Sequence, residues 1–213
     1  MRDALSELLR PKEFSDLLQP QQIISSLEAM AQAKSPNNML FYGSPGLGKS
    51  SAARILLARL GDNSFEINGS LQTGIDVGRE IESGATSCGL GSGPRVCLID
   101  EADYLSKQAQ AGLRGLIEKV YTNCRFILTA NSVRKIDLAL RSRCMPICFD
   151  VPASACSEII ARVLPKYLAQ LRALNIEIEE KRVRELFPIY FPDLRGLANR
   201  IEFEAMSHQM VSG

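Results

Sequence analysis

The 213-residue sequence has no tryptophan, one histidine and few aromatic side chains, which make up 6% of the chain. Its six cysteines include no CxxC pair, so with His208 as the single histidine a structural zinc module is not expected. Cysteines scattered through apolar stretches are more often reduced core residues than disulfides. No apolar run approaches the roughly 20 residues that cross a bilayer, and the polar start does not resemble a secretory leader. These absences predict a cytoplasmic protein.

An excess of one charge sign is also missing, because 25 basic and 24 acidic side chains leave a formal net charge of +1. Wholesale wrapping of nucleic acid is therefore not expected, and any contact with DNA has to come from a few placed lysines or arginines. What is present is an ordinary globular composition, with 46% hydrophobic and 23% charged residues, in a chain long enough to bury a core.

Short apolar runs alternate with stretches of helical periodicity, which is typical of a parallel β-sheet flanked by helices. Five strands are expected, at Asn38–Tyr42, Ser64–Asn68, Arg95–Ile99, Arg125–Ala130 and Pro146–Phe149. Helices are expected at Asp3–Leu9, Pro20–Gln32, Ser50–Leu60, Gly74–Ser83 and Lys107–Lys119, with a loop rich in glycine and serine at Ser83–Pro94. The sequence therefore predicts an α/β fold with a five-stranded parallel sheet.

The pattern changes after Val151 and Pro152, where strand signals give way to helical periodicity. Helices are expected at Ser154–Leu174, Glu179–Phe187 and Leu194–Met206, with Asn175–Ile178 as the one candidate strand. We therefore expect two domains: residues 1–152 form an α/β core and residues 153–213 a small all-helical lid, with a hinge at Asp150–Pro152.

The strongest local motif is GSPGLGKS, residues 43–50, which fits G-x-x-x-x-G-K-[ST] in full between a predicted strand and a predicted helix. Its glycines let backbone N–H groups cradle phosphate oxygens, and the helix N-terminus adds positive potential. Lys49 is placed to reach the terminal phosphates, and the Ser50 hydroxyl to ligate Mg²⁺. The residues expected to bind the nucleotide here are Ser44, Pro45, Gly46, Leu47, Gly48, Lys49, Ser50 and Ser51.

Polar residues follow two of the predicted strands. RVCLIDEAD, residues 95–103, carries Asp100 and Glu101 at the end of an apolar strand, and FILTAN ends in Asn131. Asp100 would hold Mg²⁺ and Glu101 would activate the attacking water, since phosphoryl transfer needs positioning and charge neutralisation more than covalent help. Asn131 would hold the same water. Taken alone, these residues also fit a solvated turn, a helix cap or an asparagine that closes a strand.

Two arginines lie in short motifs later in the chain. Arg143, in RSRC, is a candidate to stabilise transition-state charge on a neighbouring subunit's nucleotide. In FPDLR, Pro192 and Asp193 favour a helix start, which places Arg195 in the first turn. The helix dipole disfavours a cation in that turn, which indicates that Arg195 has a function such as binding phosphate. A plain surface arginine is the alternative for both.

Taken in this order, the elements resemble the AAA+ ATPases. Gly43–Ser50 resembles the Walker A motif and Cys97–Glu101 the Walker B motif, while Asn131, Arg143 and Arg195 resemble sensor 1, the arginine finger and sensor 2. The resemblance implies an ATP hydrolase that uses ATP and Mg²⁺. The catalytic residues it implies are Glu101, Lys49, Asn131, Arg143 (in trans) and Arg195, with Ser50 and Asp100 as metal ligands.

Longer segments are similar to the clamp loaders within that superfamily: LRPKEFSDLL (9–18), EINGSLQTGIDVGREI (66–81), DEADYLSKQAQAGLRGLIEK (100–119) and SRC (142–144). TNCRFILTAN, SRC and FPDLR together most resemble the large ATPase subunit of T-even-type phage clamp loaders. The first segment implies that Arg10 and Pro11 lie near adenine. The implied protein works with other clamp-loader subunits, without a membrane partner, to place a sliding clamp on primer–template DNA. Its implied location is the host cytoplasm if the gene is phage-encoded.

The same resemblance implies two contacts with the DNA backbone. Arg79 fits the arginine of G-I-D-x-x-R, and Arg114 the first arginine of A-L-R-R. Such contacts would be independent of sequence and sensitive to salt. Thr73 and Gly115 stand where the family often has arginine, which weakens the coupling to DNA. The third, helical collar domain of the family is expected to be absent from this chain.

Two other functions stay open. A different DNA-linked AAA+ machine, acting in recombination or replication restart, fits a chain without a collar, but the SRC and GID motifs argue against it. A non-catalytic nucleotide-binding interaction module is the third possibility, and the intact Lys49 and Glu101 argue against that one.

Overall fold

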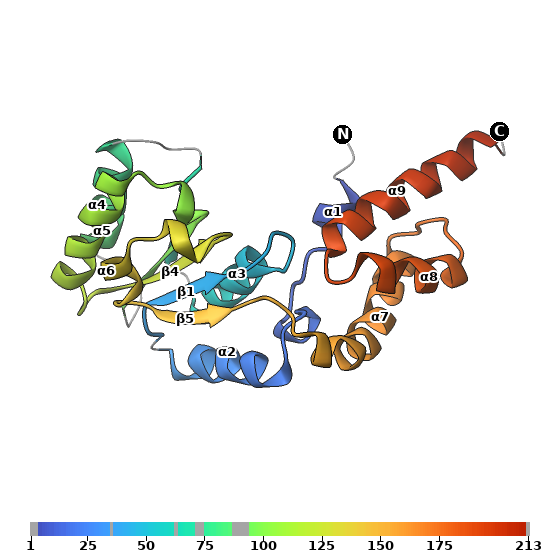
Figure 1. The fold of residues 1–213 in the computed structure, drawn as a ribbon, viewed down its shortest axis with the longest axis horizontal. Helices are drawn as coiled ribbons and strands as arrows, with labels where there is room; N and C mark the ends of the chain where they lie inside the picture. The colour runs from blue at the N-terminus through green and yellow to red at the C-terminus, as the bar shows by residue number, and fades with distance from the viewer. Residues whose placement is uncertain (1–3, 35, 62–63, 71–74, 87–93, 212–213) are drawn as a thin grey trace. The chain divides into compact units, whose positions relative to one another are not determined.

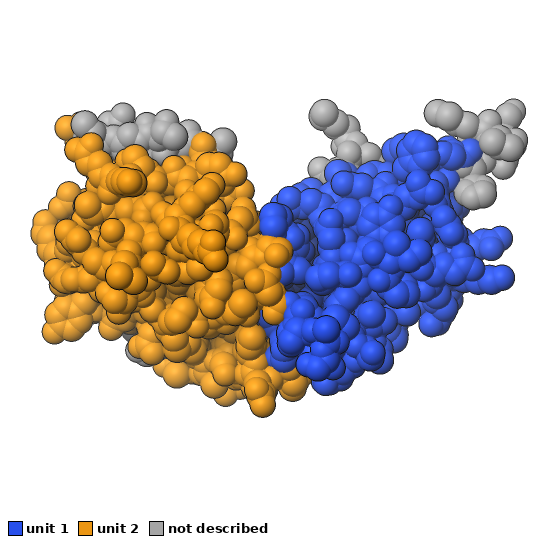
Figure 2. Space-filling view, in the orientation of Figure 1, with its two compact units in different colours: residues 1–20, 45–48, 151–213 blue, residues 21–44, 49–150 orange. Residues whose placement is uncertain are grey.

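The computed structural model describes residues 4–34, 36–61, 64–70, 75–86 and 94–211, with the backbone alone at 75–77 and 208–211. The chain divides into two compact units, which Figures 1 and 2 show. Unit 1 comprises residues 1–20, 45–48 and 151–213, and unit 2 comprises residues 21–44 and 49–150.

Unit 2 contains a five-stranded sheet in the order β2-β3-β4-β1-β5, in which every neighbouring pair is parallel. The strands are β1 (Met39–Tyr42), β2 (Ser64–Asn68), β3 (Arg95–Asp100), β4 (Cys124–Ala130) and β5 (Met145–Cys148). The central strands β3 and β4 are buried along almost their whole length, as expected of a parallel sheet covered by helices. The predicted five-stranded parallel sheet is confirmed.

Helices flank this sheet (Figure 1). They are α2 (Gln21–Ala33), α3 (Lys49–Leu60), α4 (Ile75–Thr86), α5 (Lys107–Lys119) and α6 (Leu138–Arg141), with single 3-10 turns η2 (Ala102–Tyr104) and η3 (Val133–Lys135). Helix α3 packs on β3 and β4, α4 on β3, and α5 on β4. The α5 boundaries match the prediction because Ser106 caps the helix by accepting a hydrogen bond from the Ala109 N–H.

The core of unit 2 lies between the sheet and its helices. Leu40, Ile99, Phe126 and Leu128 are completely buried in it. Burial of each such side chain contributes roughly 1.5–3 kcal/mol to folding. This apolar layer fixes the strands, and their carboxyl ends therefore present a rigid edge on which polar residues can be held.

One buried polar side chain fixes the loops at that edge. Gln110 of α5 is 3% exposed, and its amide nitrogen donates to the carbonyls of Leu105 and Lys135, each at 3.1 Å. Its amide oxygen accepts from the Asp137 N–H at 2.7 Å. Since buried polar groups are costly unless they are paired, this amide ties η2, η3 and the start of α6 to α5.

Unit 1 is helical. It contains α1 (Leu5–Leu8), α7 (Cys156–Ala173), α8 (Glu180–Tyr190) and α9 (Leu194–Val211), with 3-10 turns η1 (Phe14–Asp16) and η4 (Ala153–Ala155). The rings of Tyr167 and Phe187 meet edge to face in its core, 5.5 Å apart. The N-terminal segment clusters with these helices, since the Leu5 N–H donates to the Glu202 carboxylate of α9 at 3.2 Å.

Two predictions of local structure were wrong. The predicted strand at Asn175–Ile178 is an irregular connection: Asn175 has φ +52°, and Ile176 and Ile178 pack on the core of unit 1 instead of joining a sheet. The predicted loop from Ser83 begins later, because α4 continues to Thr86; residues 87–93 of that loop lie outside the described part of the chain.

The cysteines of the described residues are free thiols. Cys97, Cys124 and Cys144 are buried in unit 2, as the sequence predicts for core cysteines, and burial raises the pKa of Cys124 to about 11 and that of Cys144 to about 12. These thiols therefore stay protonated at neutral pH and are poor nucleophiles. Among the described residues, no helix has the length and apolar character that a membrane span requires.

Candidate functional site

Three strands end side by side where the sequence motifs lie. In the sheet, β4 stands between β3 and β1, so Asp100 at the end of β3, Gly43 after β1 and Asn131 after β4 share one edge. Ligands of open α/β sheets bind outside the carboxyl ends of the strands. The fold of unit 2 therefore brings the first and last residues of the glycine-rich loop, the acidic pair and the asparagine to the same edge.

The glycine-rich loop uses backbone conformations that favour glycine. Gly43, Gly46 and Gly48 have φ values of +142°, +81° and +81°. A Cβ atom on Gly46 would lie 2.7 Å from a carboxylate oxygen of Asp193, a contact within unit 1. An alanine at position 46 would therefore be both strained and obstructed.

Lys49, the first residue of α3, reaches back to the first two residues of this loop. Its ammonium group donates to the carbonyl oxygens of Gly43 and Ser44, each at 2.8 Å, and the residue is only 7% exposed. A buried cation held on two backbone carbonyls of a glycine-rich loop fits the phosphates of a nucleotide, for which these carbonyl contacts can be exchanged. The predicted nucleotide-binding residues 49–51 follow one another in the first turn of α3.

Asp150, two residues after β5, contacts the first residues of the glycine-rich loop. Its carboxylate accepts a hydrogen bond from the Ser44 N–H at 2.8 Å, and that bond lowers the pKa of the Asp150 carboxyl below its usual value. A Cβ atom on Gly43 would lie 3.0 Å from both the Asp150 backbone nitrogen and its carboxylate. Any other residue at position 43 would therefore be strained and would press against Asp150.

We predict that Asp150→Asn lowers the free energy of unfolding by roughly 1 kcal/mol at pH 7, since the bond uses a charged acceptor but is exposed to solvent. Because the folded-state pKa is lowered, the stabilisation is present above the ordinary carboxyl pKa of about 4 and is lost as pH falls through the folded-state value. Urea unfolding of both proteins between pH 2.5 and 7 measures this. An equal difference at every pH would contradict it.

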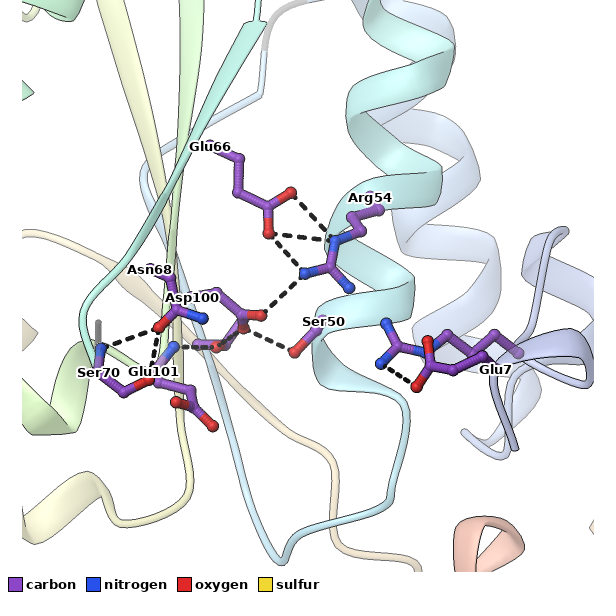
Figure 3. Close-up of polar contacts among 10 residues, drawn as sticks. Glu7, Ser50, Arg54, Glu66, Asn68, Ser70, Asp100 and Glu101 are labelled. Carbon is purple, nitrogen blue, oxygen red and sulfur yellow. Dashed lines mark hydrogen bonds and ion pairs between the residues drawn. The ribbon is translucent and has the colours of Figure 1, made fainter. Parts of the chain in front are cut away.

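The carboxylate of Asp100, at the end of β3, accepts hydrogen bonds from three side chains (Figure 3). It is 5% exposed, and its Oδ1 atom accepts from the Ser50 hydroxyl at 2.6 Å and from the Thr129 hydroxyl. Its Oδ2 atom lies 3.1 Å from the Arg54 guanidinium. A hydroxyl and a carboxylate oxygen in contact are the hard donors that Mg²⁺ prefers, so Ser50 and Asp100 fit this metal.

Glu101 stands next to it in a strained backbone conformation. Its φ and ψ of 56° and 43° lie in the left-handed region, which costs a non-glycine residue of order 1–2 kcal/mol. Its N–H donates to the Thr129 hydroxyl at 2.9 Å. The buried strand β3 before it sustains this strain.

Asn131 is half-buried just after β4. The next residue, Ser132, donates its N–H to the buried Asp103 carboxylate at 3.2 Å, which connects the loop after β4 with the DEAD segment. Asn131 therefore lies in a loop that is held against the residues following Glu101.

Arg143 is held near the C-terminal end of α5. Its Nε atom donates to the Glu118 carboxylate at 2.9 Å, Nη2 also contacts Glu118, and Nη1 donates to the Ala139 carbonyl at 2.6 Å. The side chain is 31% exposed. This candidate arginine finger is thus presented at the surface of unit 2 with a defined direction.

The remaining predicted residues divide between the units. In unit 1, Arg10 pairs with Glu7 at 2.7 Å and Pro11 follows it, while Arg195 is exposed in the first turn of α9, which Asp193 caps through the Gly196 N–H. Arg79 and Arg114, the candidate DNA contacts, are both exposed in unit 2, on α4 and α5. These two helices pack on each other, so the arginines belong to one helical layer.

Comparison with known proteins assigns the family. The ATPase family associated with various cellular activities (AAA) matches residues 39–151, more than half of the chain. The chain belongs to the AAA family. The match covers all five strands of the sheet and the helices between them.

This AAA-family chain is also similar to curated relatives over nearly its whole length. It is 30% identical over 213 residues to replication factor C small subunit 1 of Pyrobaculum aerophilum, covering 96% of this chain and 63% of that protein. It is 32% identical over 214 residues to the replication factor C small subunit of Archaeoglobus fulgidus, covering 96% and 65%. The chain thus spans less than two thirds of the length of these relatives.

Among solved structures, the fold is similar to the Thermotoga maritima RuvB Holliday junction branch migration motor, with a TM-score of 0.62 and 22% identity. The similarity covers 94% of this chain and 72% of that one. At this level of identity it supports the AAA fold alone.

Three residues that hold this AAA site together were missed by the sequence analysis. They are Thr129, which bridges Asp100 and the Glu101 N–H; Arg54, which contacts Asp100; and Asp150, which holds the Ser44 N–H. A polar Thr129 in the otherwise apolar run FILTA was the one available signal. Arg54 and Asp150 give no comparable signal, because they act across the sheet on residues 46 and 106 positions away.

Proposed function

We propose that this chain is an ATPase subunit of a sliding-clamp loader, which uses ATP binding and hydrolysis to open a ring clamp and load it on primer–template DNA. The observation that carries the proposal is the similarity to replication factor C small subunits along 96% of the chain. The geometry of unit 2 supports it, because Gly43, Ser44, Lys49 and Ser50 of the glycine-rich motif share one sheet edge with the acidic pair and the asparagine.

Each residue at that edge has a proposed task in hydrolysis. Lys49 exchanges its contacts with Gly43 and Ser44 for phosphate oxygens of ATP. Ser50 and Asp100 would hold Mg²⁺, which supplies charge neutralisation on the phosphates when bound. Glu101 positions the attacking water and accepts its proton, and Asn131 holds that water in line.

Four further residues have proposed tasks. We propose that Arg143 acts on the nucleotide of a neighbouring subunit, since it is presented at the surface and directed by Glu118. Arg195 would grip phosphate, and Arg10 with Pro11 would lie near adenine. We keep residues 1–152 as the proposed nucleotide-binding core and 153–213 as the proposed helical lid. Residues 1–20 and 45–48 of that core group with the lid helices in compact unit 1.

The finer assignment is to the large ATPase subunit of a T-even-type phage clamp loader. It is supported by TNCRFILTAN, SRC and FPDLR, in which Asn131, Arg143 and Arg195 are found. The proposed partners are other clamp-loader subunits, a ring clamp and DNA. Its proposed location is the cytoplasm, the host's in the case of a phage, which agrees with the free thiols of the described cysteines.

The test is binding of primer–template DNA by the wild-type protein and by Arg79→Ala and Arg114→Ala, in the presence of a non-hydrolysable ATP analogue. The resemblance to clamp loaders implies that each arginine contacts the DNA backbone, and both are exposed on helices that pack together. Each variant should weaken binding equally for every sequence and reduce the slope of log affinity against log salt by about 1. Fluorescence anisotropy between 50 and 300 mM salt, roughly the range in which such slopes are resolved, measures this.

Exposed Lys181 on α8 offers a matched control, and Lys181→Ala should leave both affinity and slope unchanged. No binding of primer–template by the wild-type protein, or an unchanged slope in both arginine variants, would overturn the proposed DNA contacts.

A further inference from the structure

Arg54 connects the metal-binding carboxylate to a second acidic residue (Figure 3). It lies four residues after Ser50 on α3, so both side chains stand on the same face of that helix. Its Nη2 atom is 3.1 Å from Asp100 Oδ2, while Nε donates to both carboxylate oxygens of Glu66 in β2, at 3.1 and 3.2 Å. Three elements, α3, β2 and β3, therefore meet at one guanidinium group.

The guanidinium fixes the direction of the Asp100 carboxylate. The Oδ1 atom of Asp100 already accepts from the hydroxyls of Ser50 and Thr129. The two-point pairing of Arg54 with Glu66 fixes the plane of the guanidinium, and its single Nη2 contact with Oδ2 then restrains rotation of the Asp100 carboxylate about its last bond. Asp100 is thus held from both oxygens.

Glu66 balances the positive charge that Arg54 places beside Asp100. An arginine in contact with a metal-binding carboxylate would repel Mg²⁺ and compete for the same oxygen. Glu66 pairs with the same guanidinium, so the Arg54–Glu66 pair adds no net charge beside Asp100. The side chains of Arg54 and Glu66 are 38% and 36% exposed, a setting in which an ion pair contributes little to stability. Its contribution lies in orientation and charge balance.

We propose that Arg54 is a positioning residue that orients Asp100 for Mg²⁺, and that Glu66 is the counter-charge that keeps Asp100 available to the metal. This inference rests on the proposed ATPase function. The two residues therefore differ in what their loss should do. Loss of Arg54 removes the orientation of Asp100, and loss of Glu66 leaves the positive charge of Arg54 uncompensated beside Asp100.

The experiment compares Arg54→Met and Glu66→Gln in two measurements. The first is the affinity for Mg²⁺ of the protein saturated with a non-hydrolysable ATP analogue, measured by calorimetry. The second is ATP turnover as a function of Mg²⁺ concentration. Glu66→Gln should weaken Mg²⁺ binding by about fivefold or more, with maximal turnover at saturating Mg²⁺ within about threefold of wild type.

Arg54→Met should instead affect turnover and not the affinity for Mg²⁺. Maximal turnover should fall by about tenfold because Asp100 loses its fixed orientation, while the affinity for Mg²⁺ is not weakened, since a positive charge has been removed. Arg54→Lys keeps the charge without the planar fork, and it carries the test if Arg54→Met does not fold. It should retain wild-type metal affinity with reduced turnover.

Glu82→Gln is the matched control, since it breaks the exposed ion pair of Glu82 with Lys119, which joins α4 and α5. It should change neither measurement. Equal effects of Arg54→Met and Glu66→Gln on both measurements, or none from either, would overturn the inference. A wild-type protein that lacks Mg²⁺-dependent turnover would instead contradict the proposed function itself.

Discussion

Glu101→Gln is expected to lower the rate of ATP turnover by about 100-fold or more while leaving ATP binding intact. Glutamine has the shape of glutamate but cannot accept the proton of the attacking water. Glu101 does not belong to the phosphate-binding loop, and its backbone N–H bond to Thr129 is independent of the side chain. The substitution therefore removes the chemical step and keeps the architecture.

Steady-state phosphate release and equilibrium binding of a fluorescent ATP analogue measure the two parts of this prediction. The exposed Glu158→Gln on α7 is a matched control and should behave as wild type in both. Turnover that survives in Glu101→Gln would assign the general base to another residue. Loss of nucleotide binding would instead show that Glu101 is needed for the fold of the site.

Lys49→Met is expected to weaken ATP binding by about 100-fold or more, since a charge-assisted contact with phosphate is lost. It should also lower stability by roughly 1–3 kcal/mol, because Lys49 is buried and donates to the carbonyls of Gly43 and Ser44. The two effects separate by measurement: calorimetric titration with ATP gives the affinity, and urea unfolding without nucleotide gives the stability.

Lys107→Met, at an exposed position at the start of α5, is the control for removing a lysine from unit 2. It should change neither affinity nor stability appreciably. If Lys49→Met bound ATP like the wild-type protein, the glycine-rich loop would not be the phosphate site.

The parts of the fold that the sequence predicted well are those set by local pattern. β2 and α5 have the predicted boundaries, because Ser64–Asn68 is followed by a turn and α5 is capped by Ser106. The phosphate loop was equally readable, since each glycine position reflects a local backbone demand at residues 43, 46 and 48.

The parts that escaped prediction depend on contacts between distant segments. Asn175–Ile178 has the composition of a strand, yet its isoleucines pack on the helical core of unit 1, whose described residues include no strand to pair with. Residues 4–20 cluster with α9 through contacts such as that of Leu5 with Glu202, almost 200 positions away. Single-sequence periodicity contains no information about either choice.

The site shows the same division. Lys49, Ser50, Asp100 and Glu101 were predicted from motifs because each lies at a fixed place relative to a strand end. The groups that orient them were not. The bond of Arg54 to Asp100 follows from the register of β2 beside β3 and from the position of α3, and neither can be obtained from spacing along the chain.

The most direct test of the clamp-loader assignment is steady-state ATP turnover by the wild-type protein without DNA, with single-stranded DNA and with primer–template DNA, all at low salt. We predict that primer–template raises turnover severalfold above both other conditions, with single-stranded DNA close to the rate without DNA. Turnover that is the same in all three conditions would contradict it, and would leave an AAA-family ATPase whose work is not coupled to a primer–template junction.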